Sequence, residues 1–499
     1  MVSNRLTRSG IALALATGTI VPGTIAIASS NAARHVEAPA TAAADLPLGS
    51  MYRVVDQIGA RALWQQGIDG SGVNVAVIDT GVAPVEALAQ QVVAVVDLSN
   101  EAGVAEARFI DTYGHGTHMA GIVAGATPGA DPAQAAAHPE WFMGVAPRAG
   151  IVSVKVADNT GAVDITQVIA GVDWVTDHAA ELNIKVLNLS YSSGSTLPYA
   201  TDPLAYAVER AWRSGIVVVV AAGNDGRQER HLSSPAIDPW VLSVAGAEAL
   251  TADKFIVPNW ATSGDTARNP DVSAPGAHID SLRAPRSRVD IEHPEGYVSD
   301  TLFRGSGSSQ AAAVTSGAAA LLLDARPGLT PDQVKALLIS SADATRFTPA
   351  LAQFSGAGLI RVDVAAGLPT PTAAQSWPLS DGSAPLSAAR VGGDTDLLGR
   401  PIIGETTVLG TPWAGTRWTG TRWTGGSWDG TRWTGGEWMG TRWTDSSWTG
   451  TRWTGTRWTG TRWTDSSWTG TRWTDSSWTG TRWTGTSWTG TRWTGGGWS

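Results

Sequence analysis

Four short runs of β-branched residues are the feature that most constrains the fold of this chain. They read VNVAVID, IVSVKVA, KVLNLSY and IVVVVAAGN, and they begin at residues 73, 151, 185 and 216. Each run is largely apolar and ends near Gly, Asp, Asn or Ser, which is typical of parallel strands that are covered by helices on both faces. The sequence therefore predicts an α/β fold built on a parallel sheet.

Helical segments lie between and after these runs. Asp164 precedes a segment in which apolar residues recur at i, i+3, i+4 and i+7, so it is the expected N-cap of a helix packed on the sheet. Thr330 and Pro331 take the cap and first-turn positions of another helix. Strands and helices alternate from about residue 51 to 368, which predicts one large domain.

Three polar residues stand where a parallel α/β sheet places its active site, at or beyond the carboxyl ends of strands. Asp79 closes the run VAVID, His115 lies between glycines in DTYGHGTHMAG, and a serine opens the Ala-rich helix in FRGSGSSQAAAV. A buried carboxylate needs hydrogen-bond donors, and a helix N-terminus favours developing negative charge. Each residue also has a plainer interpretation, Asp79 as a turn or cap former and the serine as an ordinary N-cap.

A metal site is the other interpretation of the histidines. His115 and His118 are three residues apart, a spacing that can present two ligands on one helix face. No cluster of further His, Cys or Glu follows at a plausible spacing, and no EF-hand-like loop is present. The sequence therefore does not favour zinc, and the identity of any metal ligands stays unknown.

The order Asp, His, Ser, with each residue in a glycine-marked turn, resembles the subtilisin-like serine proteases, or subtilases. The resemblance covers roughly residues 51–368 and rests on VIDTGV, GHGTHMAG, GVAP, VLNLSY, AAGNDG, VSAPG and GSSQAAAVTSG. It implies a subtilisin-like parallel sheet with helices on both faces. It also implies a serine endopeptidase that cleaves proteins or peptides, requires no cofactor for catalysis and could carry structural calcium.

The resemblance assigns roles position by position. It implies Ser309 as nucleophile, His115 as general base and then acid, and Asp79 as the carboxylate that orients the imidazole. Ser309 is expected to react rather than Ser308, because Gly307 and Ser308 take the Gly-Thr positions of the family motif.

The resemblance also implies how substrate binds. The family adds the substrate as a strand between two edge segments, which is β-augmentation. Asn224 is implied as a side-chain donor to the oxyanion, beside the backbone N–H of Ser309. The implied edges are Gly161, Ala162 and Val163 on one side and Ser190, Tyr191 and Ser192 on the other, with Ala222, Gly223 and residues near 233–236 lining the pocket for the residue before the scissile bond.

The chain departs from the family motif at several positions. Ser308, Gln310 and Ala313 replace Thr, Met and Pro around the nucleophile, and we expect activity to survive these changes because the hydroxyl is kept and a helical hydrogen bond is regained. Ser192 and Ser193 replace a glycine pair beside the pocket, which puts a preference for large apolar residues in doubt. They also suggest a maturation protease dedicated to one surface partner.

The first residues predict export. Arg5 and Arg8 give a basic start, an apolar stretch follows, and Ala-Ile-Ala at 26–28 offers a cleavage site, so residues 1–28 are interpreted as a signal peptide. The alternative is an uncleaved membrane anchor, but Pro22 and several Gly and Thr residues interrupt the apolar stretch. The chain has no cysteine, which fits a bacterial secretion route. We therefore expect a secreted protein, extracellular or associated with the cell wall.

Composition divides the rest of the chain. Residues 29–50 are Ala-rich and are interpreted as a short linker or pro-segment, residues 51–368 as the catalytic domain, and residues 369–412 as a Pro/Ser/Gly/Ala-rich linker. Charged residues make up only 16% of the chain, the net charge is −9, and no long run of like charge occurs. Nucleic acid is therefore not an expected partner.

Residues 413–499 form a Trp-rich repeat. A tryptophan stands at every fifth position from Trp413 to Trp498, which accounts for 18 of the 25 tryptophans. Gly and Thr disfavour helix, so the repeat is expected to be β or irregular, as in a solenoid of stacked units. Ten arginines against five acidic residues give it a net charge of +5. Cell-wall glycan binding, self-association and a structural spacer are the three interpretations, the first because indoles stack well on sugar rings.

Two hypotheses follow for the whole chain. The first is a secreted serine endopeptidase that hydrolyses peptide bonds through an acyl-enzyme on Ser309. The alternative is a surface or glycan-binding protein whose protease domain is degenerate and whose tryptophan repeat carries the function.

Overall fold

The computed structural model describes residues 43–390, except 229–230, 265–267 and 373, together with residue 402 and the backbone of short strands between Trp423 and Gly495. The predicted signal peptide lies outside the described residues, as does most of the predicted linker or pro-segment at 29–50. Within the described part of the chain, no helix is long and apolar enough to cross a bilayer.

The main body alternates strands and helices, as the sequence pattern predicts. The strands are β1 (Asn74–Asp79), β2 (Val92–Asp97), β3 (Gly150–Lys155), β4 (Ile184–Leu189), β5 (Val217–Ala221), β6 (Leu242–Ala249), β7 (Phe255–Ile256), β8 (Val272–Pro275), β9 (Ile279–Leu282) and β10 (Leu302–Gly305). The helices are α1 (Met51–Gln57), α2 (Ala60–Trp64), α3 (His115–Ala124), α4 (Ile165–His178), α5 (Pro203–Arg213), α6 (Arg288–Glu292), α7 (Ser308–Ala325), α8 (Pro331–Ser341), α9 (Val362–Gly367) and α10 (Leu386–Ala389).

One large sheet organises the body. Its strand order is β2-β3-β1-β4-β5-β6-β7, and β8 also pairs with β6. Every pair in it is parallel except β6 with β7. The four apolar runs of the sequence form β1, β3, β4 and β5, so the prediction of a parallel α/β sheet is confirmed. The chain passes from β1 to β2 and β3 on one side of β1, and then from β3 to β4 on the other side. Open α/β sheets bind their ligands where the strand order changes direction in this way.

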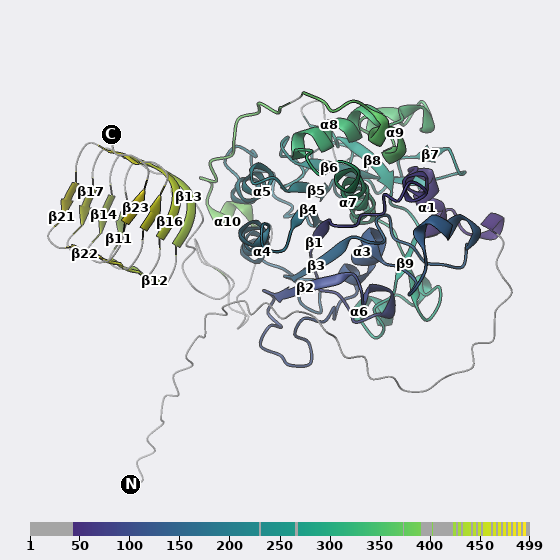
Figure 1. The fold of residues 1–499 in the computed structure, drawn as a ribbon, viewed down its shortest axis with the longest axis horizontal. Helices are drawn as coiled ribbons and strands as arrows, with labels where there is room; N and C mark the ends of the chain where they lie inside the picture. Colours follow the sequence, from purple (N-terminus) through teal and green to yellow (C-terminus); the bar gives the residue numbers. More distant parts are fainter. Residues whose placement is uncertain are drawn as a thin grey trace, which may run out of the picture.

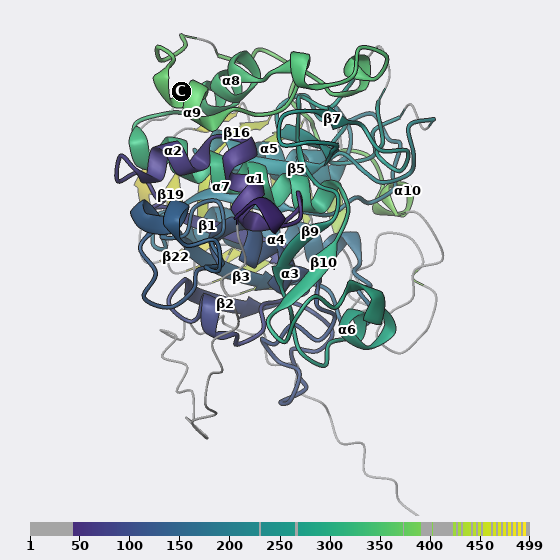
Figure 2. The same ribbon diagram turned by 90° about the vertical axis from the view of Figure 1, so that its right-hand side faces the viewer.

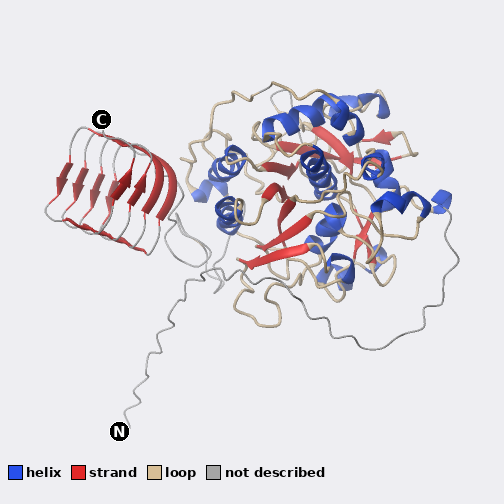
Figure 3. Ribbon diagram, viewed as in Figure 1, coloured by secondary structure: helices blue, strands red, loops and turns tan. Residues whose placement is uncertain are grey.

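Helices cover both faces of this sheet. Helices α4 and α5 lie on one face and α3 and α7 on the other (Figures 1 and 3). The antiparallel pair β9 and β10 lies beside the large sheet (Figure 2). The two predicted helix starts are confirmed, because Asp164 and Gln167 form a capping box at α4, and Thr330 and Gln333 form one at α8.

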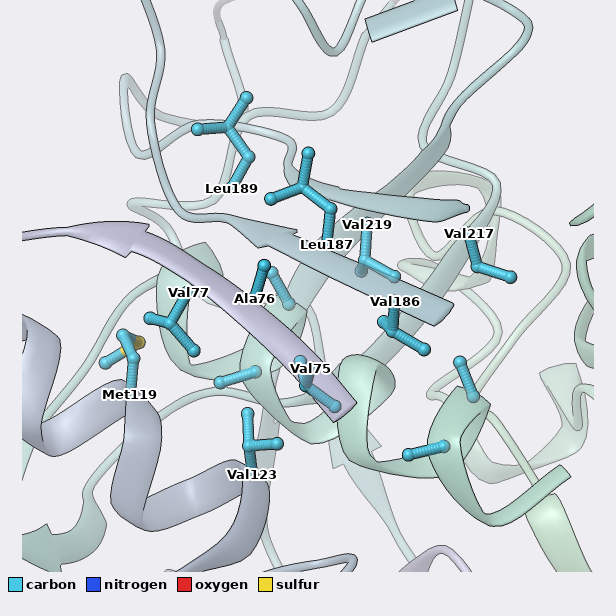
Figure 4. Packing of buried hydrophobic residues seen from close by; sticks show 14 of the residues in the cluster. Val75, Ala76, Val77, Met119, Val123, Val186, Leu187, Leu189, Val217 and Val219 are labelled. Carbon is cyan, nitrogen blue, oxygen red and sulfur yellow. The ribbon is translucent and has the colours of Figure 1, made fainter. Parts of the chain in front are cut away.

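The core lies between the sheet and these helices. Figure 4 shows Val75 and Val77 of β1 on the side of Met119 and Val123 of α3. All four side chains are buried. Side chains alternate along a strand, so Asp79 lies on the same face of β1 as Val75 and Val77. The alternation therefore directs the carboxylate toward α3.

Residues 369–390, which composition placed in a linker, lie against the main body. Leu386 and Ala389 of α10 are fully buried. The Ser380 N–H donates to both carboxylate oxygens of Glu209 at 2.9 Å. Arg390 forms an ion pair with Asp164, the N-cap of α4, at 2.7 Å. The packed body therefore continues beyond residue 368.

Short strands repeat along the tail, each beginning at a tryptophan. They are β11 (Trp423–Gly425), β12 (Trp428–Gly430), β13 (Trp433–Gly440), β14 (Trp443–Asp445), β15 (Trp448–Gly450), β16 (Trp453–Gly460), β17 (Trp463–Asp465), β18 (Trp468–Gly470), β19 (Trp473–Asp475), β20 (Trp478–Gly480), β21 (Trp483–Gly485), β22 (Trp488–Gly490) and β23 (Trp493–Gly495). Pairing is parallel and in register, so that Trp423 pairs with Trp443, and Trp443 with Trp463, along the backbone ladder.

Candidate active site

Asp79 and His115 meet at the carboxyl end of β1. Asp79 is the last residue of β1, and His115 is the first residue of α3. The two carboxylate oxygens of Asp79 lie 2.8 and 2.9 Å from Nδ1 of His115. Because an ionised carboxylate only accepts hydrogen bonds, Nδ1 carries the proton, and the lone pair of Nε2 remains for another partner.

Two glycines allow α3 to begin this close to β1. Gly114 precedes the helix with a φ of 111°, in the left-handed region that favours glycine. A side-chain carbon at Gly116 would lie only 2.2 Å from the carbonyl oxygen of Gly81. A larger residue at 116 would therefore push the histidine away from the turn that follows Asp79.

Asp111 is a buried carboxylate that sequence reasoning missed, and it fixes the turn before α3. Its Oδ1 accepts hydrogen bonds from the Thr80 hydroxyl at 2.8 Å and from the Gly114 N–H at 2.6 Å. Its Oδ2 accepts from the N–H and the hydroxyl of Thr117 at 2.8 and 2.6 Å. These donors come from the turn after β1 and from both sides of the helix start, so one carboxylate locks the two elements together. The available signal was an aspartate four residues before a histidine in a glycine-marked turn.

The two histidines of this region have opposite pKa shifts. Burial alone would lower the pKa of His115, but the negative charges of Asp79 and Asp111 and the hydrogen bond to Asp79 outweigh it, so the pKa lies above 6.5. Burial, together with the charge of His115, lowers the pKa of His118 to about 4. His115 can therefore take up a proton near neutral pH, whereas His118 stays neutral.

The structure gives no support to a zinc site at these histidines. Nδ1 of His115 is bound to Asp79, and Nε2 of His118 lies 3.1 Å from the carbonyl oxygen of Phe303. Among the residues that the structure describes, no group of three or more His, Cys, Asp or Glu is placed to hold a metal ion.

The two neighbouring serines at the start of α7 differ in burial and in hydrogen bonding. Ser308 is 1% exposed, and its hydroxyl donates to Oδ1 of Asn224 at 3.0 Å and accepts from the Gly223 N–H at 3.1 Å. Ser309 is half-buried in the first turn of the helix. The Ser308 hydroxyl is thus occupied in holding the loop after β5, and Ser309 is the more accessible of the two serines.

Asn224 lies against the N-terminus of α7. Its Oδ1 accepts the backbone N–H of Ser308 at 2.8 Å, which places the amide oxygen toward the helix and the Nδ2 donor at the other end. The residue as a whole is exposed. One end of the amide therefore holds the helix while the other can donate to a bound group.

The histidine and serine sides come together through packing and through β4. Helix α3 packs against α7, and β1 pairs with β4. The Ser190 hydroxyl, directly after β4, donates to the carbonyl oxygen of Ser309 at 3.2 Å. Among the described residues, no hydrogen bond joins the Ser309 hydroxyl to His115. Catalytic hydrogen bonds are often long in ligand-free proteins and shorten when substrate binds.

The segments expected to bind substrate border this site. Gly161, Ala162 and Val163 lie in an irregular segment between β3 and α4, and a side-chain carbon at Gly161 would lie 3.0 Å from the ring of Tyr113, two residues before His115. The segment of Ser190, Tyr191 and Ser192 is tied to the candidate nucleophile at its first residue, because the Ser190 hydroxyl donates to the carbonyl oxygen of Ser309. Ala222 and Gly223 follow β5, beside Ser308.

Comparison with known proteins yields one family and many relatives. The model of the Subtilase family matches residues 70–358. Serine protease AprX of Bacillus subtilis is 35% identical over 290 residues, which cover 56% of this chain and 63% of AprX. Subtilisin DY of Bacillus licheniformis is 31% identical over 315 residues, 62% of this chain and 96% of that protein. The chain thus spans less than two thirds of the length of AprX but nearly all of subtilisin DY.

A solved structure is similar as well. The crystal structure of fervidolysin from Fervidobacterium pennivorans, described as a keratinolytic enzyme related to subtilisin, superposes with a TM-score of 0.52 and 26% identity. The match covers 66% of this chain and 48% of that one.

Proposed function

Because this chain belongs to the subtilase family of serine peptidases, we propose that it is a serine endopeptidase that hydrolyses protein through an acyl-enzyme on Ser309. The observation that carries the proposal is the contact of both Asp79 carboxylate oxygens with Nδ1 of His115 at 2.8 and 2.9 Å. This contact fixes the tautomer whose Nε2 can accept a proton from a serine hydroxyl.

The first chemical step is attack of the Ser309 hydroxyl on the scissile carbonyl. His115 Nε2 takes the hydroxyl proton, and the resulting imidazolium is stabilised by Asp79. The tetrahedral oxyanion accepts hydrogen bonds from Nδ2 of Asn224 and from the N–H of Ser309, at the N-terminus of α7. His115 then gives the proton to the leaving amine, which leaves the acyl group on Ser309.

The second step returns the enzyme to its starting state. A water molecule attacks the acyl group, with His115 as general base, and the same two donors stabilise the second oxyanion. All of these roles belong to side chains and backbone groups of the chain, so the proposed chemistry requires no cofactor.

A fluorophosphonate probe tests the proposal directly. The wild type should be labelled and should cleave casein, because both reactions need the nucleophile and its base. Ser309→Ala should abolish both while it keeps the thermal midpoint of the wild type. Ser340→Ala, on the exposed side of α8, is the matched control and should keep both activities. Failure of the folded wild type to react would rule the enzyme out.

The alternative function, a surface or glycan-binding protein with a degenerate protease domain, has weaker support. In a degenerate site, the polar residues would no longer be held by the hydrogen bonds that catalysis needs. Here Asp79, His115 and Asn224 keep hydrogen bonds that suit catalysis. Normal labelling by the probe would exclude this alternative.

We also propose that the protein is exported and acts outside the cell or at the cell wall. The basic start and the apolar stretch before Ala28 support this. N-terminal sequencing of protein from the culture medium should give a start after residue 28. A start at Met1 in the cell fraction would contradict export.

For the tail, we propose a parallel β-solenoid that binds cell-wall glycan. The strand ladders pair residues 20 positions apart, so four five-residue units make one coil, and tryptophan positions are in register with tryptophan positions along each ladder. A regular array of this kind would match a polymer with a regular repeat. Deletion of residues 413–499 should leave probe labelling intact and abolish sedimentation with purified cell walls. Unchanged sedimentation would indicate a spacer, and loss of oligomers alone would indicate self-association.

A further inference from the structure

A pair of serine hydroxyls connects two segments next to the candidate site. The hydroxyls of Ser192 and Ser233 are hydrogen-bonded to each other. The Ser193 N–H donates to the carbonyl oxygen of Ser234 at 2.9 Å, and the Ser193 hydroxyl donates to the same oxygen at 3.2 Å. The two segments therefore run side by side, joined by backbone hydrogen bonds and by the short polar side chains of serines.

The pair lies close to the nucleophile along the chain. Ser190 contacts the Ser309 carbonyl, and Ser192 follows only two residues later, which is at most about 7 Å of extended chain. Ser192 is exposed, whereas Ser233 is 9% exposed. The pair thus joins an exposed residue to a buried one.

A substrate bound along Ser190–Ser192 would place one side chain over this pair. With the scissile carbonyl at Ser309 and Asn224, the side chain of the residue that carries this carbonyl would lie between Ser190–Ser192 and Ala222–Gly223. The Gly223 N–H donates to the Ser308 hydroxyl, so the Ala222–Gly223 segment, which forms one wall of this space, is held in place. The space between the walls then ends at the two hydroxyls.

We propose that the Ser192–Ser233 pair closes the pocket for the residue before the scissile bond, so that the enzyme prefers proteins with Ala, Ser or Gly at that position. This inference rests on the proposed peptidase function. A Phe or Leu side chain would have to part the two hydroxyls. The Ser192 hydroxyl would keep the Gly194 N–H as a donor, whereas the Ser233 hydroxyl would be buried without its partner. A small side chain leaves the pair intact, and a substrate serine could hydrogen-bond to it.

Peptide substrates that differ only in this residue test the proposal. The wild type should cleave the Ala and Ser peptides at least about tenfold better, in kcat/KM, than the Phe peptide, because one unpaired buried polar group has roughly that effect. The double variant Ser192→Gly, Ser233→Gly should shift the Ala-to-Phe ratio toward Phe by about tenfold or more. Ser193→Ala is the matched control and should keep the wild-type ratio, because its hydroxyl donates to the Ser234 carbonyl and accepts from the Ser195 N–H but does not touch the Ser192–Ser233 pair.

The outcomes separate this inference from the proposed function. If no peptide is cleaved and the fluorophosphonate does not react, the peptidase function fails and the inference fails with it. If the wild type reacts with the probe but prefers the Phe peptide, only the closed pocket is wrong. An active double variant with the wild-type ratio would also overturn it.

A second inference comes from two buried lysines far from this pair. Nζ of Lys155 lies 2.6 Å from Oε2 of Glu101, 2.5 Å from the carbonyl oxygen of Ile110 and 3.2 Å from that of Ala107. The Thr112 hydroxyl is 3.4 Å away. The side chain of Lys155 is fully buried. Its ammonium thus joins separate points of the loop that leads from β2 to His115.

Lys335 makes a similar set of contacts on α8. Its Nζ lies 2.6 Å from the carbonyl oxygen of Pro239, 2.8 Å from that of Val241 and 3.4 Å from Oδ1 of Asp271. Each buried ammonium therefore has two carbonyl oxygens and one carboxylate oxygen around it. Carbonyl and carboxylate oxygens are also the ligands that calcium prefers.

We infer that the ammonium groups of Lys155 and Lys335 replace bound metal cations in this fold. Calcium is therefore not needed to hold the loop between β2 and His115 or the loop around Pro239 and Val241. Calcium does not fit either oxygen cluster while the ammonium fills it, because the two positive charges would repel each other. The first tethered loop precedes His115, and the second follows the segment that contains Ser233.

Thermal unfolding of the full chain tests this inference. Excess EDTA and excess calcium should leave the midpoint of the wild type unchanged. Lys335→Ala should lower it by roughly 6–15 °C, because a buried charge pair loses one partner. Methylammonium chloride should restore part of this loss, whereas tetramethylammonium, which is too large, should not. Lys185→Ala, at an exposed position of β4, is the matched control and should keep the wild-type midpoint.

Two results would overturn the inference. One is a wild type that EDTA destabilises and calcium restores. The other is a Lys335→Ala protein as stable as Lys185→Ala. If Lys335→Ala does not fold, Lys335→Met is used in its place, because methionine keeps most of the packing of the lysine side chain. The EDTA measurement is made on the wild type and does not depend on either variant.

Discussion

The histidine side and the serine side of the candidate site are held by different kinds of group. Asp111, on the histidine side, is 3% exposed and accepts four hydrogen bonds. Asn224, on the serine side, is exposed and holds only Ser308. A buried carboxylate can fix geometry but cannot reach a substrate, whereas an exposed amide can hold a helix with one end and donate with the other. The imidazole is therefore oriented before substrate arrives, while oxyanion stabilisation depends on a group with two roles.

The largest effect on the histidine side is expected from Asp79→Asn. The amide would donate to Nδ1 of His115, which forces the proton onto Nε2 and removes the general base. We expect kcat to fall about 10⁴-fold, with little change in the thermal midpoint. Stopped assays with a chromogenic peptide would measure this.

The pH profile provides the control for that variant. The wild type should gain activity as pH rises through the His115 pKa, which Asp79 and Asp111 hold above 6.5. Loss of the Asp79 charge should move this limb of the residual activity to lower pH. An unmoved limb would mean that another group controls the profile.

On the serine side, Asn224→Ala and Asn224→Asp separate the two roles of the amide. Both variants lose the Nδ2 donor, so kcat should fall about 10²- to 10³-fold in each, with a smaller change in KM. Only Asn224→Ala also removes the acceptor for the Ser308 N–H, and it should be about 1–2 kcal/mol less stable than the aspartate variant in urea. Equal stabilities would show that Oδ1 does not hold the helix.

A smaller effect is expected when one of the hydrogen bonds accepted by Asp111, which we call the carboxylate web, is removed. Thr80→Val keeps the shape but removes the hydroxyl that donates to Asp111 and accepts from the Gly116 N–H at 2.8 Å. We expect about 1–3 kcal/mol of lost stability and a drop in kcat of about tenfold. Thr176→Val, whose hydroxyl bonds only to Val172 within α4, is the control and should keep kcat unchanged. Equal kcat values for both variants would mean that the web does not position His115.

The sequence predicted the fold well because the sheet is buried on both faces. Continuous apolar runs such as Val217–Ala221 have few other places in a globular domain, and the caps at Asp164 and Thr330 are local signals. The linker interpretation of 369–390 failed to foresee the packing of this segment. Pro and Ser suggested solvent, but burial of Leu386 and the contact of Ser380 with Glu209 depend on distant residues that no local pattern reveals.

The candidate site was predictable in part for the same reason. Asp79 and His115 stand in turns whose glycines are needed for close approach, so the local sequence carries the signal. The web of Asp111 and the Ser192–Ser233 pair join residues 31 and 41 positions apart. Short polar side chains have no periodicity, and their pairing across loops is visible only in the folded chain.

The last prediction concerns the stability of the histidine side in acid. The pKa of His118 is about 4 when folded, against 6.5 as its ordinary value. As pH falls from 6.5 to about 4, the unfolded chain binds a proton that the folded chain does not, so His118 removes stability in this window. His115 acts in the opposite sense, because its raised pKa adds stability below 6.5 that is lost as pH rises through the folded value. His118→Gln, whose amide can still donate to the Phe303 carbonyl, should cancel only the first effect. Its free energy of unfolding should therefore gain roughly 3 kcal/mol on the wild type between pH 6.5 and pH 4. A constant difference between the two proteins across this range would mean that His118 takes up its proton without unfolding the core.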